Sequence, residues 1–183
     1  MTPIYLIVGP PAVGKSTTSR ALAAHFPKSL YIPVDDLRTM VVSGLVLPAA
    51  VWTDELAQQI TLARQTAVHM ALTYSRAGFA VVIDDFWDAN HAVDYAGLLD
   101  PTLSPLGKVV LYPSQAEAHQ RNLKRSGDTP ARGYIDEGIR IVYHQLQPVI
   151  GQLKEQGWLI LDTTAMPVET TVETILEQTA TEH

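Results

Sequence analysis

The sequence predicts an α/β protein built in three layers, with a five-stranded parallel β-sheet between two layers of helices. Five short apolar runs of strand length alternate along the chain with segments whose apolar residues recur at helical spacing. Such alternation folds as parallel strands, because each helix returns the chain across one face of the sheet. No repeat or linker interrupts the pattern over the 183 residues, so we expect a single domain spanning residues 1–183.

The composition is that of a globular chain and excludes several kinds of site. Hydrophobic residues make up 46% and charged residues 17%. The net charge of −6 argues against a strong, sequence-independent grip on nucleic acid, although it leaves a local basic patch open. The absence of cysteine excludes disulfides, thiolate metal sites and a cysteine nucleophile. No apolar run is long enough to span a bilayer and no charged leader precedes the first strand, so we expect a cytoplasmic protein with no membrane partner.

The most informative segment joins the first predicted strand, residues 4–8, to the first helix. Residues 9–16 read GPPAVGKS, which is G-x-x-x-x-G-K-[ST] in its proper strand–loop–helix context. Backbone N–H groups of such a loop and the positive end of the helix converge on one hollow, which suits a polyphosphate. Lys15 supplies a mobile positive charge, and the hydroxyl of Ser16 can ligate Mg²⁺. The residues that we expect to contact a nucleoside triphosphate here are Gly9, Pro10, Ala12, Val13, Gly14, Lys15, Ser16 and Thr17.

The second predicted strand carries two polar residues to the edge of the sheet where ligands bind. Pro27 ends the first helix, and residues 30–34 form the strand. Asp35 follows it directly, and Arg38 lies one turn into the next helix; if Asp36 opens that helix, the side chains of Asp35 and Arg38 can face the same cleft. In a phosphoryl transfer, Asp35 can accept the proton of an attacking hydroxyl, and Arg38 can place a cation near the acceptor. The alternative is a helix N-cap followed by an exposed arginine.

A long amphipathic helix and a third strand lead to an acidic pair. Thr53 is the expected N-cap of this helix, and Gly78 is expected to end it. Residues 79–83 form the strand, which Asp84 and Asp85 follow. One carboxylate at such a position can hold Mg²⁺ through a water, while the other faces the acceptor. Alternating side-chain directions leave open which of the two serves the metal, and a solvated pair is the alternative.

The remaining elements complete the alternation. Ser114 and Glu117 predict a capping box, and Pro148 should kink or split a later helix. We expect residues 43–52 to form a loop or a short helical turn, and residues 101–105 to be a connector. The other predicted elements are strands at 108–112 and 158–161, helices at 115–125 and 135–153, and a last helix that Pro167 opens.

Three arginines near a turn-rich break are candidates for contacting phosphate. Arg121 and Arg125 lie four residues apart and share one helix face. They lead into residues 126–133, bounded by glycines, which we expect to form a short lid carrying Arg132. Planar guanidinium groups stabilise the charge on transferring phosphoryl oxygens. Arginines on a solvated helix face are the alternative, most of all for Arg132.

Four motifs together resemble the small P-loop kinases: residues 9–16, Asp35-Asp36-Leu37-Arg38, Asp84-Asp85, and Arg121-Asn122-Leu123-Lys124-Arg125. That group includes phage-type polynucleotide 5′-kinases, zeta toxins, chloramphenicol phosphotransferases, and gluconate or shikimate kinases. The order and spacing, over nearly the whole chain, are most similar to the polynucleotide 5′-kinase domain. The resemblance implies an adenylate-kinase-like P-loop NTPase fold with strand order 2-3-1-4-5, ATP as donor and Mg²⁺ as cofactor.

The resemblance also implies roles for individual residues. It makes Asp35 the general base, Arg38 and Asp85 acceptor-site residues, and Arg125 the lid arginine on the phosphates, with Lys15 beside them. We expect Ser16 and Asp84 to hold the metal, Asp84 either directly or through a water. Arg121 is expected near the nucleotide.

Two departures from the polynucleotide kinases concern the acceptor. The net charge is negative where a nucleic-acid strand would need a basic channel, and the chain has no room for the phosphatase domain of the phage enzyme. Apolar residues 45–47 with Trp52, and Phe86 with Trp87, could instead form the walls of a partly apolar acceptor pocket. Both tryptophans are equally compatible with the core.

The leading functional prediction is a kinase that moves the γ-phosphoryl group of ATP onto a hydroxyl of a small molecule. The first alternative is a polynucleotide 5′-hydroxyl kinase. An ATP-driven switch, an ATPase or a regulatory domain is an alternative of another class. No glutamate follows the acidic pair to activate water, and no N-K-x-D guanine motif occurs, which disfavours the switch. The acceptor's identity and the oligomeric state stay open at this stage.

Overall fold

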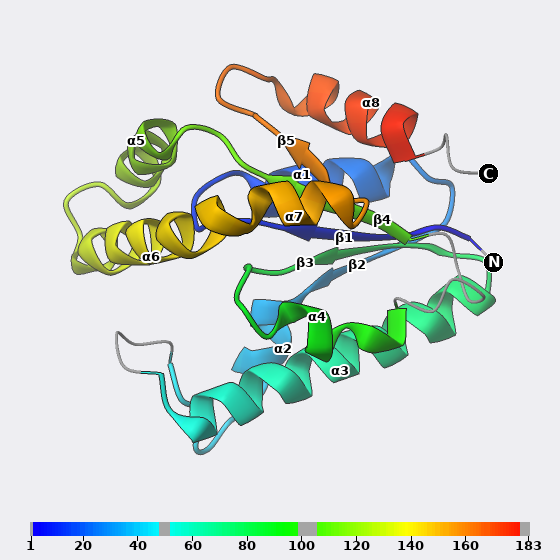
Figure 1. The fold of residues 1–183 in the computed structure, drawn as a ribbon. Helices are drawn as coiled ribbons and strands as arrows, with labels where there is room; N and C mark the ends of the chain where they lie inside the picture. The colour runs from blue at the N-terminus through cyan, green and yellow to red at the C-terminus, as the bar shows by residue number, and fades with distance from the viewer. Residues whose placement is uncertain (1, 48–51, 99–105, 180–183) are drawn as a thin grey trace.

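A computed structural model describes residues 2–47, 52–98 and 106–179, and its sheet confirms the predicted fold (Figure 1). The sheet has five strands in the order β2-β3-β1-β4-β5, and every neighbouring pair is parallel. The strands are β1 Ile4–Val8, β2 Ser29–Pro33, β3 Ala80–Asp84, β4 Leu106–Leu111 and β5 Leu159–Leu161. The helices are α1 Lys15–Ala24, α2 Val34–Thr39, α3 Asp54–Arg76, α4 His91–Asp94, η1 Ala96–Leu98, α5 Gln115–Ser126, α6 Pro130–Leu146, η2 Gln147–Val149, α7 Ile150–Glu155 and α8 Val168–Thr179.

The helices cover both faces of the sheet, as the alternating pattern predicts. Figure 1 shows α3 and α4 on one face and α1 and α8 on the other. Each face has its own apolar core, and α6 contributes residues to both. All five residues of β1 and of β3 are buried, because these strands lie inside the sheet with helices above and below. The carboxyl ends of β1, β2 and β3 therefore open onto one edge, where the site is built.

Several local predictions are confirmed, and others need correction. The hydroxyl of Thr53 caps α3 by accepting the N–H of Leu56 at 3.2 Å. The helix predicted over residues 135–153 is interrupted at Pro148 by η2, which separates α6 from α7. Helix α2 begins at Val34, two residues before Asp36, so the condition that Asp36 opens this helix is not met. The turn between α5 and α6 is short, and only its residues 127–129 lie outside the two helices, so most of the expected lid is helical.

The capping box at the start of α5 forms only in part. The hydroxyl of Ser114 accepts the N–H of Glu117 at 3.2 Å, as predicted. The carboxylate of Glu117 accepts from Arg121 at 2.8 Å, and the Ser114 N–H donates to Thr164 at 2.7 Å. An arginine one turn along the same helix offers Glu117 a charged partner, which gives the stronger hydrogen bond.

Within the described ranges, no helix combines the length and the apolar composition that crossing a membrane requires. The expected connector at residues 101–105, and residues 48–51 of the expected loop at 43–52, lie outside the described residues.

Candidate active site

The phosphate loop, residues 9–16, is shaped by its backbone. Gly9, Ala12 and Gly14 all have positive φ, of 150°, 60° and 97°. A Cβ built on Gly9 would lie 2.5 Å from the carbonyl oxygen of Leu111, so only glycine fits between the loop and β4. Gly14 is the N-cap of α1, which places the start of that helix directly after the loop. The loop therefore offers the cradle that a polyphosphate chain requires.

Lys15 is the first residue of α1, at the end of this loop. Its Nζ donates to the carbonyl of Pro10 at 2.8 Å, which folds the side chain back along the loop. Burial lowers the pKa of Lys15, and the negative charges of Asp84, Asp35 and Asp85 act in the opposite direction. The ammonium thus lies within electrostatic reach of all three carboxylates that the sequence places near the reaction.

A tyrosine that the sequence analysis missed joins the two expected metal ligands. The Tyr31 hydroxyl, from β2, donates to Asp84 Oδ2 at 2.9 Å. Burial and the charge of Asp84 raise the pKa of Tyr31 to about 12, and a hydrogen bond with the Ser16 hydroxyl acts against them. Ser16 and Asp84 therefore approach the same point from α1 and β3. Hydroxyl and carboxylate oxygens are the ligands that Mg²⁺ prefers, so the residues present fit this ion.

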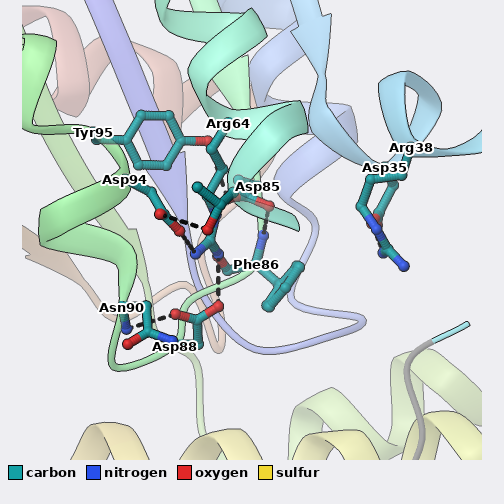
Figure 2. Close-up of polar contacts among 10 residues, drawn as sticks. Asp35, Arg38, Arg64, Asp85, Phe86, Asp88, Asn90, Asp94 and Tyr95 are labelled. Atoms are coloured by element: carbon teal, nitrogen blue, oxygen red, sulfur yellow. Dashed lines mark hydrogen bonds and ion pairs between the residues drawn. The ribbon is translucent and has the colours of Figure 1, made fainter. Parts of the chain in front are cut away.

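Asp35 and Arg38 form a pair on α2 in which the cation is buried and the carboxylate is open. Arg38 Nη1 donates to Asp35 Oδ1 at 3.1 Å, and Nη2 donates to the carbonyl of Val46 at 3.2 Å. The side chain of Arg38 is 5% exposed and that of Asp35 is 72% exposed. Figure 2 shows the two side chains lying together, away from the cluster around Arg64. The arginine thus holds the carboxylate in place without covering it.

A cavity of about 400 Å³, here called the acceptor cavity, adjoins this pair. Two of its lining residues, Leu45 and Leu47, belong to the segment that the sequence offered as an apolar wall of an acceptor pocket, and in the structure both line this cavity beside Asp35. Tyr134 of α6 also lines it and was missed. Burial and the charge of Asp35 raise the pKa of Tyr134, while Arg38 lowers it, so its hydroxyl lies close to the pair. The lining residues described are Asp35, Arg38, Thr39, Leu45, Leu47 and Tyr134.

Asp85 does not face the acceptor cavity, contrary to the role that the resemblance implied. Its side chain has no exposed surface. Its Oδ2 accepts from Arg64 Nε at 2.6 Å and from the Tyr95 hydroxyl at 3.0 Å. Burial raises the pKa of Asp85 to about 6, although Arg64 opposes this shift. A carboxylate enclosed in this way positions the chain after β3 and cannot touch an acceptor without rearrangement.

The Arg64 cluster consists of Arg64 and the carboxylates of Asp85, Asp88 and Asp94 (Figure 2). Arg64 lies in the middle of α3, is fully buried, and reaches Asp88 and Asp94 at 2.9 Å each. It also donates to the carbonyl of Phe86 at 3.2 Å. A buried cation bonded on all sides fixes the segment after β3 against α3. The signal for it was present in the sequence, since Arg64 interrupts the apolar stripe of an amphipathic helix.

Trp87, the other expected acceptor residue from this segment, belongs to the core. It is 7% exposed and packs in the apolar cluster that α3 and α6 share. Of the two alternatives that the sequence left open for Trp87, the structure therefore favours the core. Trp52 is 46% exposed and does not line the acceptor cavity.

The three candidate arginines have different surroundings. Arg121 ties the phosphate loop to the segment after β5, donating to the carbonyls of Val13 at 2.9 Å and Thr163 at 2.7 Å. Arg125 is exposed, and its charge lowers the pKa of Lys15, so the two cations lie within electrostatic range of each other. Arg132 lies in the first turn of α6 and pairs along the helix with acidic neighbours.

Fold and loop together define a P-loop nucleotide-binding protein of the three-layer α/β class. A family model described as an AAA domain matches residues 4–140, and the chain belongs to that family. No protein with a curated description matches the chain by sequence.

Solved structures share the fold over nearly the full length. The tunicamycin resistance protein of Deinococcus radiodurans is 22% identical with a TM-score of 0.69, covering 97% of this chain and 95% of its own. A gluconokinase from Sinorhizobium meliloti 1021 is 18% identical with a TM-score of 0.64, covering 97% and 91%. The shikimate kinase of Acinetobacter baumannii is 15% identical with a TM-score of 0.62, covering 97% and 92%. At these identities the likeness establishes the fold.

Proposed function

We propose that this protein is a Mg-ATP-dependent kinase that transfers the γ-phosphoryl group to a hydroxyl of a small-molecule acceptor. One observation carries the proposal: Asp35 presents an open carboxylate, held by buried Arg38, at a cavity within electrostatic reach of Lys15. A base, an acceptor cavity and a phosphate loop in one place are the parts that a phosphoryl transfer needs. Gluconokinase and shikimate kinase among the similar structures support an alcohol as acceptor.

In this proposal, one group of residues binds ATP and the metal, and another group binds and activates the acceptor. ATP supplies the phosphoryl group, and Mg²⁺ neutralises charge on its phosphates. The loop amides and Lys15 would hold the phosphates, and Ser16 and Asp84 would hold the metal. Asp35 accepts the proton of the acceptor hydroxyl, while Arg38 keeps its carboxylate in place. Arg125 brings a further positive charge over the loop, and Arg121 is expected to fix the loop's shape beside the nucleotide.

An acceptor screen tests the activity itself. Acceptor-dependent release of ADP is measured over a library of alcohols and single-stranded oligonucleotides, with Lys15→Met as the blank. Release above the blank with any small alcohol supports the proposal. Transfer to oligonucleotides alone would establish the polynucleotide 5′-kinase alternative. ATP binding without transfer to any acceptor would indicate a regulatory nucleotide-binding domain.

The role of Asp35 has its own test and a matched control. Asp35→Asn should lower turnover by about 10² to 10⁴, the usual contribution of a general base, and leave ATP affinity nearly unchanged. Asp36→Asn is the control, because Asp36 is the exposed neighbour on the same helix and does not line the acceptor cavity. Turnover and the dissociation constant for ATP are measured for both variants. Equal turnover in the wild type and in Asp35→Asn would remove Asp35 from this role.

A further inference from the structure

We infer that the acceptor is a neutral alcohol with an apolar body, and that anionic acceptors such as sugar acids, nucleotides and oligonucleotides are poor substrates. The inference rests on the proposed kinase function and adds the substrate class. It comes from the charge balance and the wall chemistry of the acceptor cavity.

The charges that line the acceptor cavity cancel each other. Asp35 and Arg38 are the charged side chains among its described lining residues, and they pair at 3.1 Å. Little of the Arg38 guanidinium faces the cavity: its side chain is 5% exposed, Nη1 donates to Asp35, Nη2 donates to the Val46 carbonyl, and the unpaired Nε is buried. A carboxylate or phosphate on the acceptor would have to compete with Asp35 for this cation. An unpaired anion in a partly desolvated cavity is unfavourable.

The cation of the phosphate loop is not part of the cavity wall. Lys15 is not among the described residues that line the acceptor cavity, and it is directed into the phosphate loop, where its Nζ contacts Pro10. The described wall therefore offers an acceptor no cation other than Arg38, which is already paired with Asp35, and this favours an uncharged acceptor.

The remaining wall is apolar and partly uncovered. Leu47 is 67% exposed, and Leu45 lies beside it in the segment that follows α2. The ring of Tyr134 approaches from α6, and the hydroxyl of Thr39 is occupied by the Asp36 carbonyl at 2.9 Å. Exposed leucine next to an aromatic ring gains by covering apolar ligand surface. A cavity of about 400 Å³ has the size of a drug-like small molecule.

The acceptor cavity is polar at one end and apolar at the other, and this determines how such an acceptor binds. Its hydroxyl lies at Asp35 and its body lies against Leu45, Leu47 and Tyr134. In the transfer, the O–H bond breaks as Asp35 takes the proton. The alcohol oxygen forms the new bond to the γ-phosphorus, and the bond to the bridging oxygen breaks with its electron pair leaving on ADP.

Matched pairs of acceptors test the inference. Phenylpropanol and cyclohexylethanol are each compared with the same molecule carrying a carboxylate on its ring, all at saturating Mg-ATP. We expect kcat/KM to be at least about tenfold higher for the neutral members, which corresponds to about 1.4 kcal/mol. Preference for the anionic members, or for an oligonucleotide 5′-hydroxyl, would overturn the substrate class while leaving the kinase function standing. No transfer to any acceptor, with ATP binding intact, would overturn the proposed function and this inference with it.

A pair of variants then assigns the preference to the cavity wall. Leu45→Gln should raise KM for neutral acceptors about tenfold and leave KM for ATP unchanged, because only the acceptor contacts this wall. Leu62→Gln is the control, since Leu62 is a 55% exposed leucine on α3 that does not line the cavity. Equal KM values for the two variants would show that the wall does not bind the acceptor.

Discussion

The phosphate side and the acceptor side of this site are built from different materials. The phosphate side is eight consecutive residues whose function lies in backbone angles, with Gly9 and Gly14 at positive φ. The acceptor side is assembled from side chains far apart in the sequence, such as Asp35 of α2 and Tyr134 of α6. Behind it, the Arg64 cluster joins α3 to the segment after β3. We therefore expect substitutions of glycine to damage the phosphate side most, because its shape depends on backbone angles. On the acceptor side, we expect the loss of a charged partner to have the largest effect.

The largest expected effect is at Arg64, whose cluster supports the segment after β3 and does not line the acceptor cavity. Arg64→Met leaves three carboxylates of the Arg64 cluster without their cation, so the free energy of unfolding should fall by about 3–5 kcal/mol. Arg76→Met on the same helix is the control, because Arg76 is exposed, and it should change stability by less than about 0.5 kcal/mol. Urea denaturation measures both. Similar losses of unfolding free energy in the two variants would show that the Arg64 cluster does not stabilise the contact between α3 and the segment after β3.

On the phosphate side, the corresponding test is Gly9→Ala. The new Cβ would clash with the carbonyl of Leu111, so we expect a loss of about 1–3 kcal/mol in stability together with weaker ATP binding. Gly78→Ala is the control that separates backbone strain from the steric clash. Gly78 also has a positive φ, 87°, but open space surrounds it. This variant should leave ATP affinity unchanged. ATP affinity is measured by calorimetric titration. Equal ATP affinity in the two variants would contradict the claim that the backbone at Gly9 shapes the phosphate site.

A pH experiment probes the surroundings of the Arg64 cluster. Burial and the nearby charge of Arg64 lower the pKa of His91 to about 3, from 6.5. Because the folded pKa is depressed, the folded state binds fewer protons, and stability should fall as pH decreases from about 6.5 to about 3. The expected slope is about 1 kcal/mol per pH unit. His91→Asn should lack this component, and an unchanged difference between variant and wild type across the window would contradict it.

The smallest expected effect is again on the phosphate side. Tyr31→Phe removes the hydrogen bond to Asp84, which should cost about 0.5–1.5 kcal/mol of stability. Asp84, the proposed metal ligand, also loses a positioning partner, so Mg²⁺ should be needed at several-fold higher concentration. Tyr74→Phe is the control, because Tyr74 is 39% exposed and lies at the far end of α3. The magnesium dependence of turnover is measured for both variants, and only Tyr31→Phe should need the higher concentration.

The sequence predicted the parts whose cause is local. Alternating apolar runs were enough for the parallel sheet and its strand number, and residues 9–16 for the phosphate loop. Thr53 and Pro148 act through hydrogen bonds and ring geometry in their own helices, so their effects are also local. The strand order came from the resemblance, and the structure confirms it.

What the sequence could not predict depends on contacts between distant segments. The partner of Asp85 is Arg64, which lies 21 residues earlier and on another element. Tyr134 reaches the acceptor cavity because α6 packs across the edge of the sheet, which no spacing reveals. The start of α2 at Val34 was missed because Pro33 was taken only as the end of a strand, whereas proline also suits a helix N-terminus.

The hydrogen bonds of Arg121 connect the two sides of the site. Arg121 joins the phosphate loop to α5, and α5 is locked to α6 through Asn122, which donates to Asp136 at 2.8 Å. Tyr134, half a turn away on α6, forms part of the acceptor cavity. The phosphate loop and one wall of that cavity therefore belong to one hydrogen-bonded unit, although they lie more than a hundred residues apart in the sequence.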